Sequence, residues 1–166
     1  MKRHILFFVL IGLFVSGDVH AQDEVKDFTH LLVIQKGTAS YYGKKFHLRP
    51  TASGEIFHMD SLTAAHKHLP FGTQIRVVNQ RNQKEVIVTI NDRLPPSSKR
   101  VIDLSRAAAS KINMVQSGLA PVTLSLLDFE AMEEVLAHYE EVPEEIRLRP
   151  YYETLEIPQS LERELP

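Results

Sequence analysis

Short runs of β-branched and other apolar residues, broken at close intervals by turn residues, limit the folds that this chain can adopt. Residues 74–78 and 85–90 are the clearest runs, and the polar stretch 79–84 between them predicts a hairpin loop. Four further runs are expected to form strands: 31–34, 38–42, 62–65 and 122–127. Several short strands at such close spacing predict a mainly β protein built as a small barrel.

Two segments favour short helices. Ser105 is placed to cap a helix over residues 106–112, where alanine is frequent. After the last expected strand, residues 129–141 can form an acidic helix. Its apolar side is expected to consist of Met132, Leu136 and Tyr139.

The N-terminal residues have the pattern of a secretory signal peptide. A basic start at residues 2–4 precedes an apolar run over 5–15, and Val19-His20-Ala21 resembles a cleavage site. The alternative is a membrane anchor, but the run of about 11 residues is shorter than the roughly 20 that span a bilayer. We therefore expect residues 1–21 to be removed near Ala21-Gln22, and the protein to be exported, either periplasmic or secreted.

The net charge of −2 conceals a strong division along the chain. Residues 22–127 contain 14 Lys or Arg against 8 Asp or Glu, whereas residues 128–166 contain 3 basic and 12 acidic residues. We expect a lead-in over 22–36, a barrel domain over 37–127, and an acidic, partly helical or disordered extension over 128–166. No basic stripe is interleaved with aromatic residues, which argues against nucleic-acid binding.

The chain contains no cysteine. This excludes a disulfide framework, a thiolate metal site, a cysteine nucleophile and a lipid anchor on cysteine. His66 and His68 are two residues apart, but no H-E-x-x-H motif is present. We expect neither a metal nor another cofactor.

Polar and titratable residues gather at three places where turns meet the expected strands. These segments are GTASYYG with the following RPTASGE (37–43 and 49–55), LTAAHKHLPFGT (62–73), and INDR with the following RVIDLS (90–93 and 100–105). Side chains at strand ends and in loops are the ones that a rigid scaffold usually presents to a ligand.

These segments, in this order, resemble the double-psi β-barrel domain of the rare lipoprotein A family. The resemblance covers about residues 37–127 and rests on the motifs ASYYG, TASGE, LTAAH, LPFGT, INDR and IDLS. It implies a six-stranded double-psi β-barrel. It also implies a lytic transglycosylase that cleaves peptidoglycan between N-acetylmuramic acid and N-acetylglucosamine and leaves a 1,6-anhydro end.

The family's three candidate active residues correspond to Glu55, His66 and Asp92. Cleaving a glycosidic bond requires a proton on the leaving oxygen, usually from a carboxylic acid kept protonated by its surroundings, and Asp92 is the candidate acid. Glu55 or His66 can take the proton of the attacking hydroxyl or orient the reacting groups. The alternatives are a turn carboxylate for Asp92, a solvated loop carboxylate for Glu55 and a satisfied, half-buried histidine for His66.

Neighbouring polar residues are expected to bind the substrate: Tyr41, Tyr42, Ser53, Asn91, Arg93 and Asp103. Successive side chains of a strand point to opposite faces, so at most one of the two tyrosines can form a platform for a sugar ring. Asp103 has an alternative role at the N-terminus of the expected helix, together with Ser105.

The sequence departs from the family at two glycine positions, which are occupied here by Leu48 and Leu94. A bulky residue where glycine permits unusual backbone angles can reshape the cleft. A second hypothesis is therefore a non-catalytic, expansin-like module that binds peptidoglycan glycan. A third is an interaction protein whose acidic extension binds a basic partner or covers the basic cleft. We expect a monomer, with cell-division proteins as possible partners.

Overall fold

The computed structural model describes residues 32–148. The predicted signal peptide (1–21), most of the predicted lead-in and residues 149–166 lie outside the described residues. None of the helices in the described part is long and apolar enough to cross a membrane.

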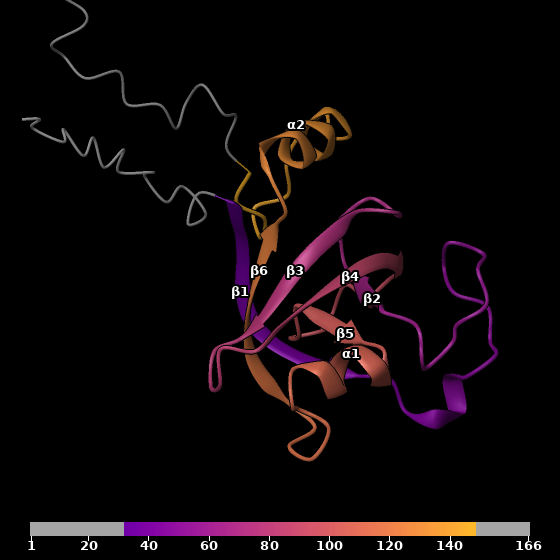
Figure 1. Cartoon of the computed structure of the whole chain (residues 1–166). Helices are drawn as coiled ribbons and strands as arrows, with labels where there is room; N and C mark the ends of the chain where they lie inside the picture. The colour runs from indigo at the N-terminus through magenta and orange to yellow at the C-terminus, as the bar shows by residue number, and fades with distance from the viewer. Residues whose placement is uncertain (1–31, 149–166) are drawn as a thin grey trace, which may run out of the picture.

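Six strands close into a barrel in the order β1-β5-β2-β4-β3-β6 (Figure 1). Two neighbouring pairs, β1 with β5 and β2 with β4, are parallel, and the remaining pairs are antiparallel. The strands are β1 (Val33–Tyr41), β2 (Thr63–His66), β3 (Gln74–Asn79), β4 (Glu85–Asp92), β5 (Ile102–Leu104) and β6 (Ala120–Leu126). The prediction of a mainly β, six-stranded double-psi barrel is confirmed.

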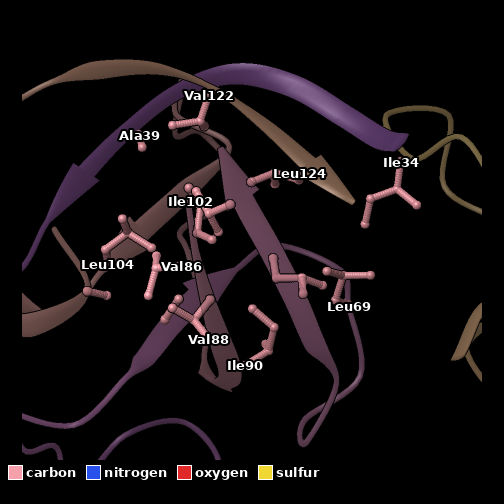
Figure 2. Close-up of a cluster of buried hydrophobic side chains, with 14 of the residues drawn as sticks. Ile34, Ala39, Leu69, Val86, Val88, Ile90, Ile102, Leu104, Val122 and Leu124 are labelled. Atoms are coloured by element: carbon pink, nitrogen blue, oxygen red, sulfur yellow. The ribbon is translucent and has the colours of Figure 1, made fainter. Parts of the chain in front are cut away.

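The barrel interior is filled by the alternate side chains of its strands. In β3 and β4 buried and more exposed residues alternate, as a strand with one face in a core requires. The inward side chains include Ile90, Ile102 and Leu124, all fully buried, and Figure 2 shows them converging between the strands. Burying each such side chain stabilises the fold by roughly 1.5–3 kcal/mol before entropy is counted.

Two strands differ from the predicted segments. β1 runs without a break from Val33 to Tyr41, so the barrel begins within the stretch 22–36 that was expected to be a lead-in. β5 was not predicted as a strand, because it has only three residues and Asp103 lies in its middle. Its pairing with both β1 and β2 compensates for its length.

The helix α1 (Arg106–Lys111) has the predicted cap. The hydroxyl of Ser105 accepts a hydrogen bond from the amide of Ala108 at 3.1 Å. Ala108 and Ala109 are fully buried, which fixes α1 against the barrel. The small alanine side chains allow this close approach of a short helix to the strands.

The described part of the acidic extension, residues 128–148, packs on the barrel. Its helix α2 (Phe129–Ala137) is capped by the Asp128 carboxylate, which accepts a hydrogen bond from the amide of Ala131 at 2.8 Å. Met132 and Val135 on α2 are buried within the hydrophobic core. The predicted helix is thus present over Phe129–Ala137, and its apolar residues join the barrel core.

A long connection between β1 and β2, residues 42–62, extends from one side of the barrel (Figure 1). It contains a single 3-10 turn, η2 (Lys44–Phe46), and a bridge between Pro50 and Ile56. Gly54 has a φ of +91°, a conformation that favours glycine, and closes the turn in which its amide donates to Thr51 at 3.0 Å. This turn carries Glu55 to the end of β4.

Candidate active site

Asp92 lies at the end of β4 and accepts three hydrogen bonds. Its Oδ1 accepts the backbone amides of Ala52 at 2.9 Å and Arg93 at 2.8 Å, and its Oδ2 accepts the hydroxyl of Tyr42 at 2.6 Å. The half-buried carboxylate is thus fixed by the residue that follows it in the chain and by two residues of the β1–β2 connection. Asp92 is therefore more than a turn residue that bonds its own backbone.

A register shift between β2 and β4 leaves Asn91 without a partner residue in β2. Ala64 pairs with Ile90 and Ala65 pairs with Asp92, so Asn91 is an extra residue in β4. Such bulges redirect side chains and are frequent beside active sites. The bulge could not be predicted from the sequence, although it lies within the INDR motif that carries the family resemblance.

Glu55 is attached to this bulge. Its Oε2 accepts a hydrogen bond from the side-chain amide of Asn91 at 2.8 Å. The amide of Ser53 donates to the Asn91 carbonyl at 3.3 Å, and the Ser53 hydroxyl lies 3.0 Å from that of Thr51. Asn91 is buried, whereas Glu55 is exposed, so the predicted residues Ser53, Glu55, Asn91 and Asp92 form one connected group with a solvent-facing carboxylate.

The two neighbouring tyrosines have different environments, as strand alternation requires. The Tyr42 ring packs against Phe57, with 4.9 Å between ring centroids, and burial followed by the hydrogen bond to Asp92 raises its pKa above the ordinary range. The Tyr42 phenol therefore stays protonated and donates to Asp92. Tyr41 instead packs against the core and donates to the carbonyl of Val115 at 3.0 Å, which leaves its hydroxyl outside the site.

Asp103 forms an ion pair beside this group rather than a contact with α1. Both of its oxygens accept from the guanidinium of Arg100, at 2.7 and 2.9 Å, and the Ser40 hydroxyl donates to one of them. The hydroxyl of Ser105 caps α1, whereas the Asp103 side chain pairs with Arg100. The charges of Asp103 and Arg100 both act on Tyr42, which places a cation near the site that sequence reasoning missed.

His66, at the end of β2, is buried and hydrogen-bonded at both ring nitrogens. Its Nδ1 accepts the amides of His68 at 3.2 Å and Leu69 at 3.1 Å, and its Nε2 lies 2.9 Å from Oε1 of Gln35. Burial lowers the pKa of His66 to about 3, and the nearby positive groups add to this effect. The ring is therefore neutral, and its hydrogen bonds within residues 32–148 connect it to neither Asp92 nor Glu55.

The side chain of Arg93 packs on the connection between β2 and β3. Its guanidinium lies over the ring of Phe71, 3.7 Å from the centroid, in a cation–π contact. Burial lowers the pKa of Arg93, while Tyr139 and Asp92 act in the opposite direction. The guanidinium also donates to the backbone carbonyl of Asp92 at 3.4 Å, which holds the cation beside the site.

A cavity of about 410 Å³ lies between the turn 70–74 and α2, beyond Phe71. Its lining includes Asp128, Glu134 and His138 from the extension, but neither Asp92 nor Glu55. This cavity is therefore separate from the group around Asp92. Within residues 32–148 no group of three or more histidine or carboxylate side chains is arranged to hold a metal ion.

The two leucines that replace family glycines behave differently. Leu48 has a φ of +62° and a largely exposed side chain, so it occupies a left-handed conformation that costs a non-glycine residue roughly 1–2 kcal/mol. Leu94 is 4% exposed and is not among the described residues with positive φ, so it packs without that strain. The loop beside Asp92 therefore accommodates leucine.

The family model described as "Lytic transglycolase" matches residues 34–124. The chain is 50% identical over 97 residues to the "Probable endolytic peptidoglycan transglycosylase RlpA" of Treponema pallidum, a match that covers 58% of this chain and 30% of the relative. It is 48% identical over 93 residues to the "Endolytic peptidoglycan transglycosylase RlpA" of Campylobacter jejuni, covering 56% and 34%. For the Neisseria meningitidis serogroup B protein of the same name the values are 46% over 103 residues, covering 62% and 41%. The chain thus spans about a third of the length of these curated relatives.

Proposed function

Because the chain belongs to the lytic transglycolase family, we propose that its barrel is an endolytic peptidoglycan transglycosylase. It cleaves the β-1,4 bond between N-acetylmuramic acid and N-acetylglucosamine within glycan strands, in remodelling or division of the cell wall. The matched relatives carry this activity in their names. The observation that supports it in this chain is the Asp92 carboxylate, held by three hydrogen bonds beside the Glu55–Asn91 pair.

The two oxygens of Asp92 have different roles in this proposal. Oδ1 accepts hydrogen bonds from two backbone amides. Because an amide N–H can only donate, a proton on Oδ1 would clash with both of these donors. Oδ2 faces only the Tyr42 hydroxyl, which can rotate and accept instead of donate. Oδ2 is therefore the oxygen of Asp92 that is placed to pass a proton to the leaving glycosidic oxygen.

The bond changes need no water. As the bond from C1 of the muramic sugar to the leaving oxygen breaks, the C6 hydroxyl of the same sugar attacks C1 and loses its proton. Glu55 is exposed and accepts one hydrogen bond, from Asn91, so it can take that proton. The products are a 1,6-anhydro end and a free hydroxyl on the departing strand, unlike ordinary glycoside hydrolysis.

His66 has a different role in this scheme. Its ring is buried, neutral and hydrogen-bonded at both nitrogens, so it does not act as a general acid or base near neutral pH. We assign His66 as a positioning residue that orders the end of β2, whose neighbour Ala65 pairs with Asp92. Tyr42, Ser53, Asn91, Arg93 and Asp103 are proposed to support or bind the substrate around Asp92.

The test is a digest of purified glycan strands by the protein and by Asp92→Asn, with mass spectrometry for 1,6-anhydro-muramyl products. Asparagine keeps an acceptor for the two amides but has no acidic proton, so we expect product formation to fall by at least about a hundredfold. Asp60→Asn, an exposed carboxylate of the same connection, is the control. If neither protein forms product while both sediment with glycan, the expansin-like binding module replaces the enzyme.

Export is a separate proposal, supported by the basic, apolar and small-residue order of residues 1–21. Expression in a Gram-negative host followed by N-terminal sequencing should give a mature protein that begins near Gln22. A chain that keeps Met1 and sediments with membranes would instead support an anchor. A monomeric state and contacts with cell-division proteins are further proposals, separate from export.

A further inference from the structure

The imidazole of His66 depends on two neighbouring segments for its orientation. The amides of His68 and Leu69, in the β2–β3 connection, both donate to Nδ1. Because Nδ1 accepts, we assign the ring hydrogen to Nε2, which donates to Gln35 of β1 at 2.9 Å. A shift of either segment would therefore turn the ring or leave a buried nitrogen unpaired.

The C-terminal extension holds the first of these segments. The hydroxyl of Tyr139 donates to the carbonyl of His68 at 2.9 Å. The Glu145 carboxylate lies 3.4 Å from Nε2 of His68, so it approaches the same residue from its side chain. The peptide that presents two amides to His66 is thus held by the Tyr139 hydroxyl, and the Glu145 carboxylate lies beside the side chain of His68.

The extension also holds the second segment. The amide of Arg147 donates to the carbonyl of Ile34 at 2.8 Å, next to Gln35 in the chain. The side chain of Ile146 is 4% exposed and belongs to the hydrophobic core. The start of β1, which carries the Gln35 partner of His66, is therefore tied to the extension as well.

These contacts come from a well-anchored element. Met132 and Val135 of α2 are buried in the core, and Asp128 caps the helix. Residues 128–148 lie beyond the matched range 34–124 of the family model. Figure 1 shows α2 and the chain that follows it next to the ends of β6 and β1.

We propose that residues 128–148 are a positioning element of the active site, and that the Tyr139 hydroxyl orients His66 by holding the His68 carbonyl. The role of His66 in the reaction rests on the function proposed above, but the orientation of its ring does not. Tyr139 is accordingly a positioning residue that touches no substrate.

The test uses the full chain with Tyr139→Phe, which removes one hydroxyl and keeps the packed ring. Ser117→Ala is the matched control, because the Ser117 hydroxyl also donates to a backbone carbonyl, that of Met114, at 3.0 Å. NMR of the histidine rings would report the tautomer of His66 and the exchange rate of its Nε2 proton. We expect Tyr139→Phe to speed that exchange about tenfold and Ser117→Ala to leave it unchanged.

Kinetics with glycan provide the second readout. We expect Tyr139→Phe to lower kcat on the order of tenfold with little change in KM, because a small displacement of a reacting group affects the transition state more than binding. If the wild-type protein has no activity, the proposed function fails, and the ring exchange still decides on the positioning role.

Two results would overturn the inference. The first is an exchange rate of the His66 ring proton in Tyr139→Phe equal to that in Ser117→Ala. The second is an equal loss of protection throughout the amides of β3 and β4. That result would mean that the variant loosens the whole fold and not specifically the segments that hydrogen-bond the His66 ring.

Discussion

The two sides of the candidate site are built in different ways. On one side, Asp92 and Glu55 lie at the mouth of the barrel and are held by residues of the β1–β2 connection and by the bulged Asn91. On the other side, His66 is buried and hydrogen-bonded to Gln35 and to the β2–β3 connection. Tyr139 of the C-terminal extension donates a hydrogen bond to that connection. The first side is exposed and chemically available, whereas the second is closed and neutral.

This difference separates chemistry from support. A carboxylate that must meet a polymer has to reach solvent, and Glu55 does so. A buried imidazole with both nitrogens paired cannot reach a substrate without breaking its own hydrogen bonds, and it instead fixes the backbone around it. The prediction treats Glu55, Asp92 and His66 as one catalytic group. We instead assign the chemistry to the two carboxylates and a positioning role to the histidine.

The largest expected effect concerns the support side. Met132 of the extension and Met114 of the barrel are both fully buried. We expect Met132→Ala to lower the free energy of unfolding by about 2–5 kcal/mol, as much as Met114→Ala does, because each leaves a cavity in one common core. Denaturant unfolding measures both variants. A cost for Met132→Ala below about 1 kcal/mol would show that the extension is an appendage.

The next effect is the pH dependence of stability due to His66. Below pH 6.5 the unfolded chain binds a proton at His66, whereas the folded protein, with a pKa of about 3, does not. Stability therefore falls as the pH is lowered from about 6.5 towards 3, with a slope from this residue of at most about 1.4 kcal/mol per pH unit. Above pH 6.5 both states are neutral and the contribution is constant.

Urea titrations at pH 4.5, 5.5 and 6.5 would isolate this slope by comparing the protein with His66→Gln. Other groups titrate in the same range, so only the difference between the two slopes counts. His58→Gln, at an exposed histidine, is the control for the substitution itself. An unchanged slope in His66→Gln would mean that the imidazole charges freely in the folded protein.

Much of the barrel could be predicted from the sequence because its strands bury alternate side chains. Residues 74–78 and 85–90 carry this alternation and a polar hairpin loop, and the structure confirms β3 and β4 there. β5 escaped prediction because three residues cannot show a period. The packing of the extension also escaped it, since an amphipathic helix does not reveal which surface it will cover.

The site was predictable to the extent that its residues fall in recognisable motifs. Asp92, Asn91 and Glu55 stand in such motifs and are brought together. Gln35, Arg100 and Tyr139 were missed, because their importance comes from contacts between segments far apart in the sequence. The spacing RVIDLS placed Arg100 three residues before Asp103, a weak signal that only the observed ion pair makes meaningful.

Returning to the chemical side, Tyr42→Phe should have a smaller effect than the changes above. It removes the hydroxyl that donates a hydrogen bond to Oδ2 of Asp92. We expect kcat to fall about tenfold, and stability to fall by about 1 kcal/mol. Tyr41→Phe is the matched control, because it loses a hydroxyl bond to Val115 on the core side. Equal kcat values for the two variants would mean that the Tyr42 hydroxyl has no role in the reaction.

The smallest expected effect tests whether the chemical side carries strain. Leu48 holds a φ of +62° in the β1–β2 connection and is 60% exposed, so replacing it loses little packing. Leu48→Gly relieves the left-handed backbone but makes the unfolded chain more flexible, so we expect a net gain of stability of at most about 1 kcal/mol. Leu94→Gly, at a buried leucine without positive φ, should instead destabilise the fold by about 2–5 kcal/mol. Thermal unfolding of both variants measures this contrast. A loss of stability in Leu48→Gly would mean that the leucine side chain, rather than the backbone angle, determines the shape of the connection that carries Glu55.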